Sequence, residues 1–329
     1  MADANCTDMI NLSSSTSLKI SLSFNLVVSM TAFPLLLWAN YQLWMMPFAK
    51  LFHVNIKILI QLHLLGFIIH CCGRITLHSL DLHNYLLLDN PCYMIPNIYR
   101  CFIFRLMYNI GIWVTGCSAI FLTIERWIAT WKSLNYENCS PLIGVLLSLL
   151  QCILAAIPLS FAYSNTKFDG VYMPYCSVYK PSFPRVAKFN AIAVIVAQLF
   201  SRIAFGRLYN WNFRERTTNL ESSLSKRFQL EQNMQSMYCL KVNANLCSVF
   251  TFLQSGSFLL LIHVAATLPS HTYLTLMEYN SGYPLFAIIT ILVMSKTITH
   301  IRGKVRTGLA TNMTTDKSLY FEIFKKQLL

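Results

Sequence analysis

The sequence predicts an all-α membrane protein, a bundle of seven transmembrane helices with its N-terminus outside the cell and its C-terminus in the cytosol. Hydrophobic residues make up 55% of the 329 residues and charged residues only 12%, whereas a soluble domain has about 25% charged residues. Seven apolar stretches are each long enough to cross a bilayer. The net charge of +13 comes from basic residues in the loops rather than on one soluble module, which excludes a nucleic-acid partner.

The first helix is expected at about residues 20–44, after a short polar extracellular tail at residues 1–19. This tail has no basic region followed by an apolar core, so we expect the first helix to act as its own insertion signal. Pro34 should kink the helix, which neighbouring helices tolerate in a membrane. Its far end carries a cluster of aromatic residues that suits an interface anchor, namely Trp38, Tyr41 and Trp44.

The second helix, expected at about residues 55–78, is unusually polar. His63, His70, Arg74 and His78 follow one another at spacings of seven, four and four, which places them on one helical face. A metal site is disfavoured, because no acidic residue lies at ligand spacing and Arg74 would repel a cation. His63 and His78 are also about 22 Å apart at ~1.5 Å per residue. We therefore expect packed, hydrogen-bonded histidines and predict neither a metal nor any other cofactor.

The third helix, expected at about residues 98–124, ends at a Glu125-Arg126-Trp127 step. A charged pair costs little where the hydrocarbon meets water. Cys101 lies 25 residues before Arg126, or about 37 Å at ~1.5 Å per residue. The two residues should therefore lie on opposite sides of the membrane.

The remaining helices are expected at about residues 141–163, 186–208, 242–267 and 272–295, before a basic cytosolic tail at residues 296–329. The longest polar segment precedes the sixth helix. Its second half has apolar residues at near-helical spacing, so we interpret it as a cytosolic extension of that helix. The end of the tail could form a short amphipathic helix on the membrane surface.

Charge sets the direction of the bundle. With the N-terminus outside, 18 of the 26 Lys and Arg residues lie on the cytosolic side and the other 8 on the outer side, as the positive-inside rule requires. Asn5 and Asn11 each begin a glycosylation sequon and would then be outside. The sequons at Asn138 and Asn312 would lie inside and stay unmodified.

Four cysteines fall in the outer, oxidising compartment under this topology. A bridge between Cys101 and Cys176 would hold the long outer loop to the third helix. Cys92 is a competing partner, and Cys6 and Cys92 could form a second bridge. Sequence alone does not decide this connectivity.

Three charged residues lie within the outer half of the helices, Arg74, Arg105 and Glu278. Unpaired charges at such depth are costly, so we predict that Glu278 pairs with Arg74, Arg105 or both. One acid cannot neutralise two arginines, so a cavity here would keep positive charge and suit a ligand with an acidic or strongly electronegative group. The alternative is that all three residues only hold the helices together.

Six runs of sequence that together cover nearly the whole chain are specific enough to indicate a family. They are KLFHVNIKILIQLHLLGFIIHCCGRITLHSLDLHNY at 50–85, IPNIYRCFIFRLMYNIGIW at 95–113, ERWIATWKSLNYE at 125–137, GVYMPYC at 170–176, LSKRFQLEQNMQS at 224–236 and FEIFKKQL near the end. Together these runs resemble the nematode serpentine receptor class alpha/beta chemoreceptors, which are similar to G-protein-coupled receptors.

The resemblance implies a chemosensory receptor in the plasma membrane of sensory neurons that binds a small ligand and signals through a heterotrimeric G protein. Arg126 is then the expected centre of G-protein coupling, held at rest by Glu125. A juxtamembrane salt bridge that only sets helix depth is the alternative. The chain departs from the wider rhodopsin-like pattern, because the third helix ends Glu-Arg-Trp and the seventh lacks an Asn-Pro-x-x-Tyr motif.

Two other classes of function are less well supported by the sequence. A transporter or channel is the main alternative, but the helices are poor in the acidic residues that a proton or cation path needs. A membrane enzyme is not expected, because no nucleophile, base and third group stand out together.

Overall fold

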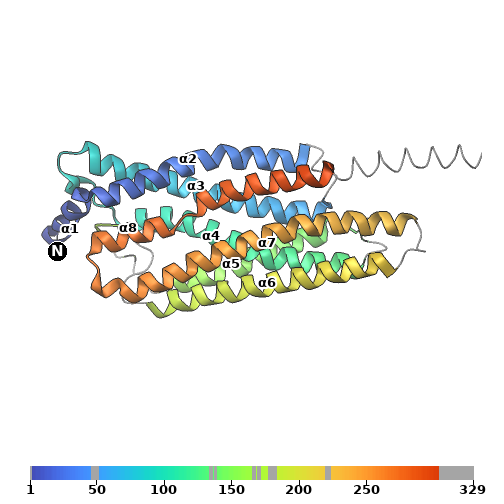
Figure 1. Cartoon of the computed structure of the whole chain (residues 1–329). Helices are drawn as coiled ribbons and strands as arrows, with labels where there is room; N and C mark the ends of the chain where they lie inside the picture. Colours follow the sequence, from blue (N-terminus) through green and yellow to red (C-terminus); the bar gives the residue numbers. More distant parts are fainter. Residues whose placement is uncertain are drawn as a thin grey trace, which may run out of the picture. The chain divides into compact units, whose positions relative to one another are not determined.

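The computed structural model describes residues 2–45, 52–132, 136, 139–164, 168, 172–176, 184–218 and 224–303. The chain falls into two compact units, Met1–Ile291 and Leu292–Leu329. The described residues are almost entirely helical (Figure 1), and they include seven helices that are long and apolar enough to cross a membrane. This confirms the predicted fold class. The direction of the bundle across the membrane stays a prediction.

The helices are mostly longer than the sequence predicts, because polar residues extend several of them beyond the apolar stretches. In the first unit they are α1 (Ala2–Ser14), α2 (Thr16–Met45), α3 (Val54–Leu87), α4 (Ile98–Trp131), α5 (Leu142–Tyr163), α6 (Pro184–Thr218), α7 (Leu224–Val264) and α8 (Ser270–Asn280). Residues 283–291 are also helical, as are residues 292–303 of the second unit. The expected amphipathic helix at the C-terminal end lies outside the described residues.

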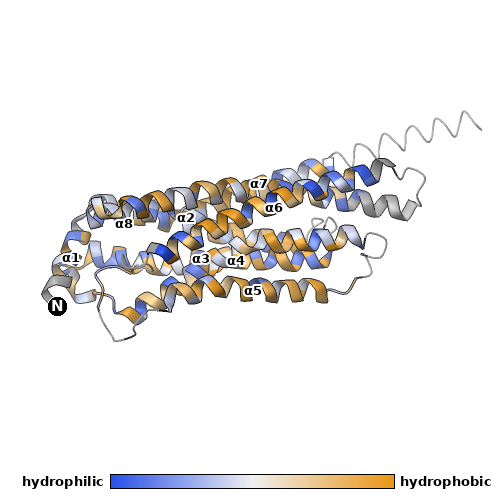
Figure 2. Ribbon diagram, turned by 90° about the horizontal axis from the view of Figure 1, so that it is seen from below, coloured by the Kyte–Doolittle hydropathy of each residue, from blue (hydrophilic) through white to orange (hydrophobic). Residues whose placement is uncertain are grey.

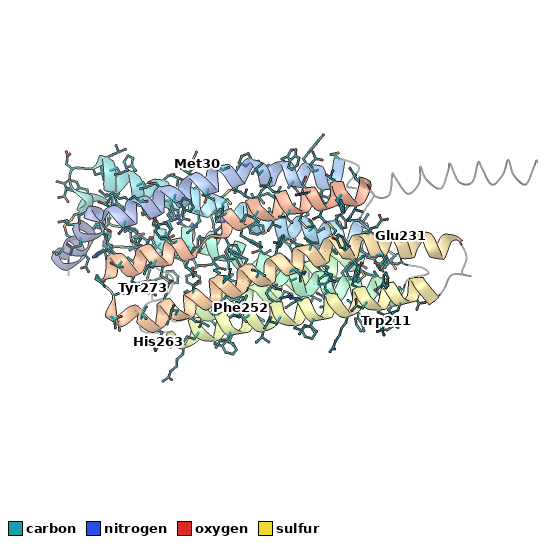
Figure 3. The ribbon with its side chains drawn as sticks, in the orientation of Figure 1. Met30, Trp211, Glu231, Phe252, His263 and Tyr273 are labelled. Carbon is teal, nitrogen blue, oxygen red and sulfur yellow. A yellow bond between two sulfur atoms is a disulfide. The ribbon has the colours of Figure 1, made fainter. Side chains whose placement is uncertain are left out.

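The outer faces of the helices are apolar. Figure 2 shows hydrophobic residues along most of α5 and along the middle of the other helices. Large side chains such as Met30 on α2, Trp211 on α6 and Phe252 on α7 point outward (Figure 3), and each of the three is more than half exposed. Apolar surface on this scale requires lipid rather than water as its solvent.

Helices α3 and α4 approach each other closely, and two glycines permit this approach. A Cβ added to Gly111 on α4 would lie 2.4 Å from the backbone oxygen of Gly66 on α3. Small residues allow membrane helices to pack backbone against backbone in this way. The packing brings His70 on α3 against α4, where His70 Nδ1 forms a 3.0 Å hydrogen bond with the Tyr108 carbonyl.

The segment assigned to the polar tail contains a helix, α1. Its residues Met9 and Leu12 are buried against Leu18 and Leu22 of α2 and against the end of α3. Only two large apolar residues of α1 are buried in this way, which explains why hydropathy alone does not predict the helix.

The C-terminal end of α3, which we predict to be on the outer side, also differs from the expectation. The helix continues nine residues beyond the expected end near residue 78, to Leu87. Asp81, Asn84 and Tyr85 are polar and suggest a loop, but they are buried, partly beneath α1 and Tyr175. Arg74 is consequently deeper in its helix than the sequence suggests.

The membrane topology makes a direct prediction about glycosylation. Asn11 is exposed on α1, so an outer N-terminus should allow a glycan there. We expect a glycosidase-sensitive shift in gel mobility that is reduced in Asn11→Gln and lost in the Asn5→Gln/Asn11→Gln variant. Asn138→Gln and Asn312→Gln, whose positions lie outside the described residues, are the controls. A shift that survives in the double variant and requires Asn138 or Asn312 would invert the topology.

Candidate functional site

Glu278 on α8 is bound by two arginines from two other helices. Its Oε2 accepts a hydrogen bond of 2.7 Å from Arg74 Nη2 on α3, and its Oε1 accepts one of 2.9 Å from Arg105 Nη2 on α4. All three side chains are buried. His78 Nε2 lies 3.6 Å from Glu278 Oε2. The sequence left open whether Glu278 pairs with one arginine or both, and in the structure it contacts both.

A break in the last spanning segment supplies further partners. The segment is non-helical at Ser281 and Gly282, and Pro284 lacks the N–H that would donate to the Asn280 carbonyl. The Ser281 carbonyl accepts a 2.6 Å hydrogen bond from Arg74 Nη1 in addition to one of 2.9 Å from the Tyr283 N–H. The same arginine nitrogen donates to Asn25 Oδ1 on α2 at 3.0 Å. Irregular backbone at membrane depth is tolerated when protein groups satisfy it in this way.

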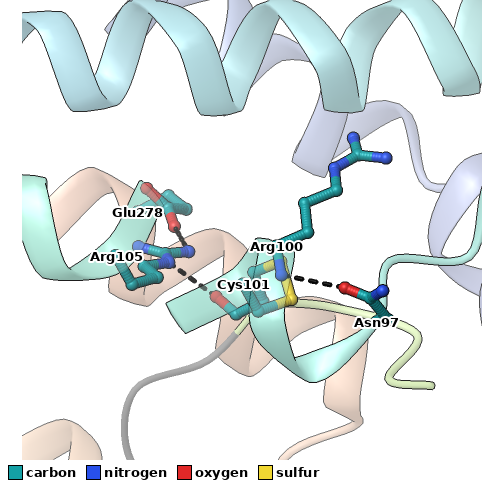
Figure 4. The surroundings of a disulfide bond; sticks show 6 residues. Asn97, Arg100, Cys101, Arg105 and Glu278 are labelled. Carbon is teal, nitrogen blue, oxygen red and sulfur yellow. Dashed lines mark hydrogen bonds and ion pairs between the residues drawn. A yellow bond between two sulfur atoms is a disulfide. The ribbon is translucent and has the colours of Figure 1, made fainter. Parts of the chain in front are cut away.

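The outer loop closes one side of the cluster. Tyr175 donates a 2.6 Å hydrogen bond to Glu278 Oε1, and burial together with the Glu278 carboxylate raises the pKa of this phenol well above its usual value. Its hydroxyl therefore stays protonated and remains a donor at physiological pH. Arg105 Nε donates to the Cys176 carbonyl at 2.6 Å (Figure 4).

Two disulfides hold the outer segments in place. Cys101 on α4 is bonded to Cys176, with their Cα atoms 4.9 Å apart, and Cys6 on α1 is bonded to Cys92, with their Cα atoms 5.3 Å apart. The bond between Cys101 and Cys176 holds Tyr175 near Arg105, because Tyr175 directly precedes Cys176 and Arg105 lies one helical turn after Cys101. The second ties α1 to the turn after α3. This is the connectivity that the sequence offered as one of its alternatives.

An inner cavity of about 160 Å³ lies beside the cluster. Arg105 and Glu278 are the only charged residues among the described residues that line it. Its other walls come from α4, α6, α7 and α8 and include Trp113, Asn190 and Phe258. A second, outer cavity of about 1190 Å³ extends from there to α1. The two cavities share five lining residues, which are Tyr175, Ala187, Phe258, Tyr273 and Leu274.

Three histidines of α3 are buried in the bundle, namely His63, His70 and His78. Besides its hydrogen bond to Tyr108, the ring of His70 packs against Tyr283, with centroids 5.3 Å apart. The ring of His63 meets Phe67 edge to face. Among the described residues, no group of His, Cys, Asp and Glu side chains is arranged to hold a metal ion.

A second polar cluster lies at the opposite end of α4, which we predict to be cytosolic. Arg126 Nε donates to Glu125 Oε2 at 2.6 Å, and its Nη2 donates to Oε1 at 2.8 Å. Both residues are almost fully buried. Arg126 Nη1 also donates to Asn233 Oδ1 on α7 at 2.8 Å, and Asn233 Nδ2 donates to Asn212 Oδ1 on α6 at 2.9 Å. Arg126 therefore links α4 to α6 and α7.

Tyr136, in the loop after α4, completes this second cluster. Its hydroxyl donates a hydrogen bond to Glu125 Oε1, and its ring centroid lies 5.6 Å from the Arg126 guanidinium carbon. The ring also packs against His53, with centroids 4.5 Å apart, at the start of α3. The loop residue thus connects Glu125 to the neighbouring end of α3.

The neutral members of both clusters were not predicted from the sequence. Asn25, Tyr175 and Ser281 surround the charged residues at the outer end, and Tyr136, Asn212 and Asn233 surround Arg126. Asn25 and Tyr136 had a detectable signal, since Asn25 interrupts an apolar stretch and Tyr136 lies within the run ERWIATWKSLNYE. Nothing in the sequence indicates that the Ser281 backbone carbonyl becomes an acceptor.

The chain is similar to nematode receptors over most of its length. Residues 3–329 match the family described as serpentine type 7TM GPCR receptor class ab chemoreceptors. The chain is 30% identical to serpentine receptor class alpha/beta-14 of Caenorhabditis elegans over 176 residues, which are 52% of this chain and 45% of that protein. It is 27% identical to serpentine receptor class alpha-10 of the same organism over 282 residues, which are 84% of this chain and 78% of that protein. The chain therefore spans less than half of the first relative.

Proposed function

The chain belongs to the class ab serpentine chemoreceptor family of seven-transmembrane receptors, and we propose on this basis that it is a chemosensory G-protein-coupled receptor. It binds a small environmental or pheromone-like ligand in the inner cavity and activates a heterotrimeric G protein at its cytosolic face. It acts in the plasma membrane of sensory neurons, and it has no catalytic role.

The observation that carries this proposal is that the inner cavity and the ion-pair cluster share two residues. Arg105 and Glu278 line the cavity, and the same two residues join α4 to α8 and, through Arg74, to α3. A ligand that contacts Arg105 or Glu278 therefore interacts with the groups that hold three helices together. Such a ligand binds two arrangements of these helices with different affinities, and a conformational switch requires this difference.

At the cytosolic face the switch is Arg126. In the described arrangement its guanidinium is occupied by Glu125 and by Asn233 of α7. A movement of α7 away from α4 breaks the contact with Asn233 and makes the guanidinium available to a partner. Asn233 is neutral, so its contact with Arg126 is a hydrogen bond and not an ion pair between helices. When α7 moves away, no acidic side chain is therefore left without its partner.

The test is ligand-evoked signalling in cultured cells that carry a G-protein reporter. Cells that express the receptor are exposed to a panel of small organic acids, amides and amines. We expect at least one compound to evoke a response that is absent in cells lacking the G protein and is lost in Arg126→Gln. Arg207→Gln is the control, because Arg207 is exposed on α6. A compound that evokes a membrane current without any G protein would support a transporter or channel instead.

A further inference from the structure

Arg105 has donor capacity that its protein partners do not use. Its Nε donates to the Cys176 carbonyl and its Nη2 to Glu278. No described residue accepts a hydrogen bond from its other terminal nitrogen, Nη1. Arg105 is also the only basic residue among the described residues lining the inner cavity. A guanidinium in this state can bind one more oxygen, and charged oxygens bind it most strongly.

The ion-paired residues beside the cavity carry an excess of positive charge. Arg74 and Arg105 share the single carboxylate of Glu278. Asp81 on α3 is a second buried acid and acts electrostatically on Arg105, but among the described residues it forms no ion pair with either arginine and its Oδ2 has no hydrogen-bond partner. Protonation of His78 would only add to the excess. A negative charge that contacts Arg105 would therefore balance the ion-paired residues.

A second wall of the cavity holds an unpaired donor. Asn190 on α6 is 6% exposed and lines the cavity, and its Nδ2 has no hydrogen-bond partner in the described part of the protein. Leaving a buried donor without a hydrogen-bond partner is energetically costly. An oxygen of a bound molecule would remove that cost, so Asn190 provides a second polar contact on a helix other than that of Arg105.

The size and walls of the cavity limit what it can hold. Its volume of about 160 Å³ is close to the ~150 Å³ of an engineered apolar cavity that binds benzene. Aromatic and aliphatic side chains make up much of the lining, including Trp113, Val194 and Phe258. A single ring or a short alkyl chain fits this space.

We infer that the inner cavity selects a small anion, a molecule with one ring or a short chain and one acidic group. Arg105 binds the acidic group, and Asn190 donates to an oxygen of the same ligand and determines specificity. This inference rests on the proposed function, because it assigns the ligand class to the cavity that the receptor uses.

The experiment measures binding of three matched probes to the purified full-length receptor in nanodiscs, without a G protein. Benzoate is the anion, benzamide is its neutral counterpart and benzylammonium is the cation. We expect benzoate to bind about tenfold more tightly than benzamide, because its hydrogen bond to Arg105 is charge-assisted, and benzylammonium to bind most weakly. In Arg105→Gln, benzoate and benzamide should bind with about equal affinity.

Arg100→Gln is the matched control. Arg100 lies on the same helix, its side chain points away from the Arg105–Glu278 pair (Figure 4), and it does not line the cavity. It should keep the full preference. Arg105→Gln should fold, because it leaves Arg74 and Glu278 as a balanced pair.

Asn190→Asp is an independent variant that places a carboxylate in the wall of the cavity. It should weaken the binding of benzoate about tenfold and change the binding of benzamide little.

Two results would overturn the inference. One is the absence of detectable benzoate binding, or equal binding of benzoate and benzamide, in the unmodified receptor. The other is a benzoate preference that persists in Arg105→Gln, or a benzoate affinity that Asn190→Asp leaves unchanged. Since no G protein is present, a receptor that selects benzoate but never signals would contradict the proposed function alone.

Discussion

Replacing Glu278 with glutamine is expected to remove most of the receptor from the cell surface. Glu278 is the carboxylate that pairs with both Arg74 and Arg105, and all three side chains are buried. Breaking a buried ion pair by removing one partner costs about 3–5 kcal/mol, because the remaining charge is left uncompensated. That cost is a large part of the about 5–15 kcal/mol that stabilises a typical folded protein. Surface labelling of an epitope-tagged receptor measures the loss.

Two companion variants show whether charge is the cause. Asp89→Asn removes an acid that is exposed beyond the end of α3, and it should leave surface expression near normal. Adding Arg105→Gln to Glu278→Gln removes one of the two unpaired cations and should restore part of the expression. Normal surface expression of Glu278→Gln, or no recovery in the double variant, would mean that the ion pairs contribute little to the fold.

Charge balance is the reason that part of this cluster could be predicted from sequence. Arg74, Arg105 and Glu278 each interrupt an apolar stretch, and a charge within a membrane must find a partner. Few candidates exist, so the pairing follows with little knowledge of packing. The seven-helix fold is predictable for a similar reason, because each spanning helix is encoded by a local run of apolar residues.

The rest of the clusters depends on packing, which sequence does not reveal. Tyr175 reaches Glu278 where the disulfide between Cys101 and Cys176 helps to hold the outer loop against α4. Asn25 and Tyr136 are neutral, so leaving them without a hydrogen-bond partner costs less than leaving a charged side chain unpaired. Many different groups could serve as their partners, and the sequence does not indicate which. The extension of α3 to Leu87 follows from burial of polar residues beneath α1, and α1 has too few apolar residues to be recognised.

Replacing Tyr136 with phenylalanine is expected to raise signalling in the absence of any ligand. Its hydroxyl donates to Glu125, which in turn holds Arg126. A hydrogen bond to a charged group contributes about 1.5–3 kcal/mol, and each 1.4 kcal/mol changes an equilibrium about tenfold. Loss of this donor from the resting arrangement should therefore increase the active population about tenfold or more. Nucleotide exchange by the G protein with the purified receptor measures the change.

The sign of this effect distinguishes a switch from a salt bridge that only sets helix depth. If Tyr136 stabilises a resting arrangement, Tyr136→Phe activates, and adding Arg126→Gln abolishes the gain because the freed guanidinium makes the contact with the G protein. Tyr238→Phe on α7 is the control, since Tyr238 is 42% exposed. If the cluster only anchors α4, Tyr136→Phe lowers stability and leaves the exchange rate per folded receptor unchanged. Unchanged exchange at equal folded receptor would therefore remove Arg126 from its proposed role.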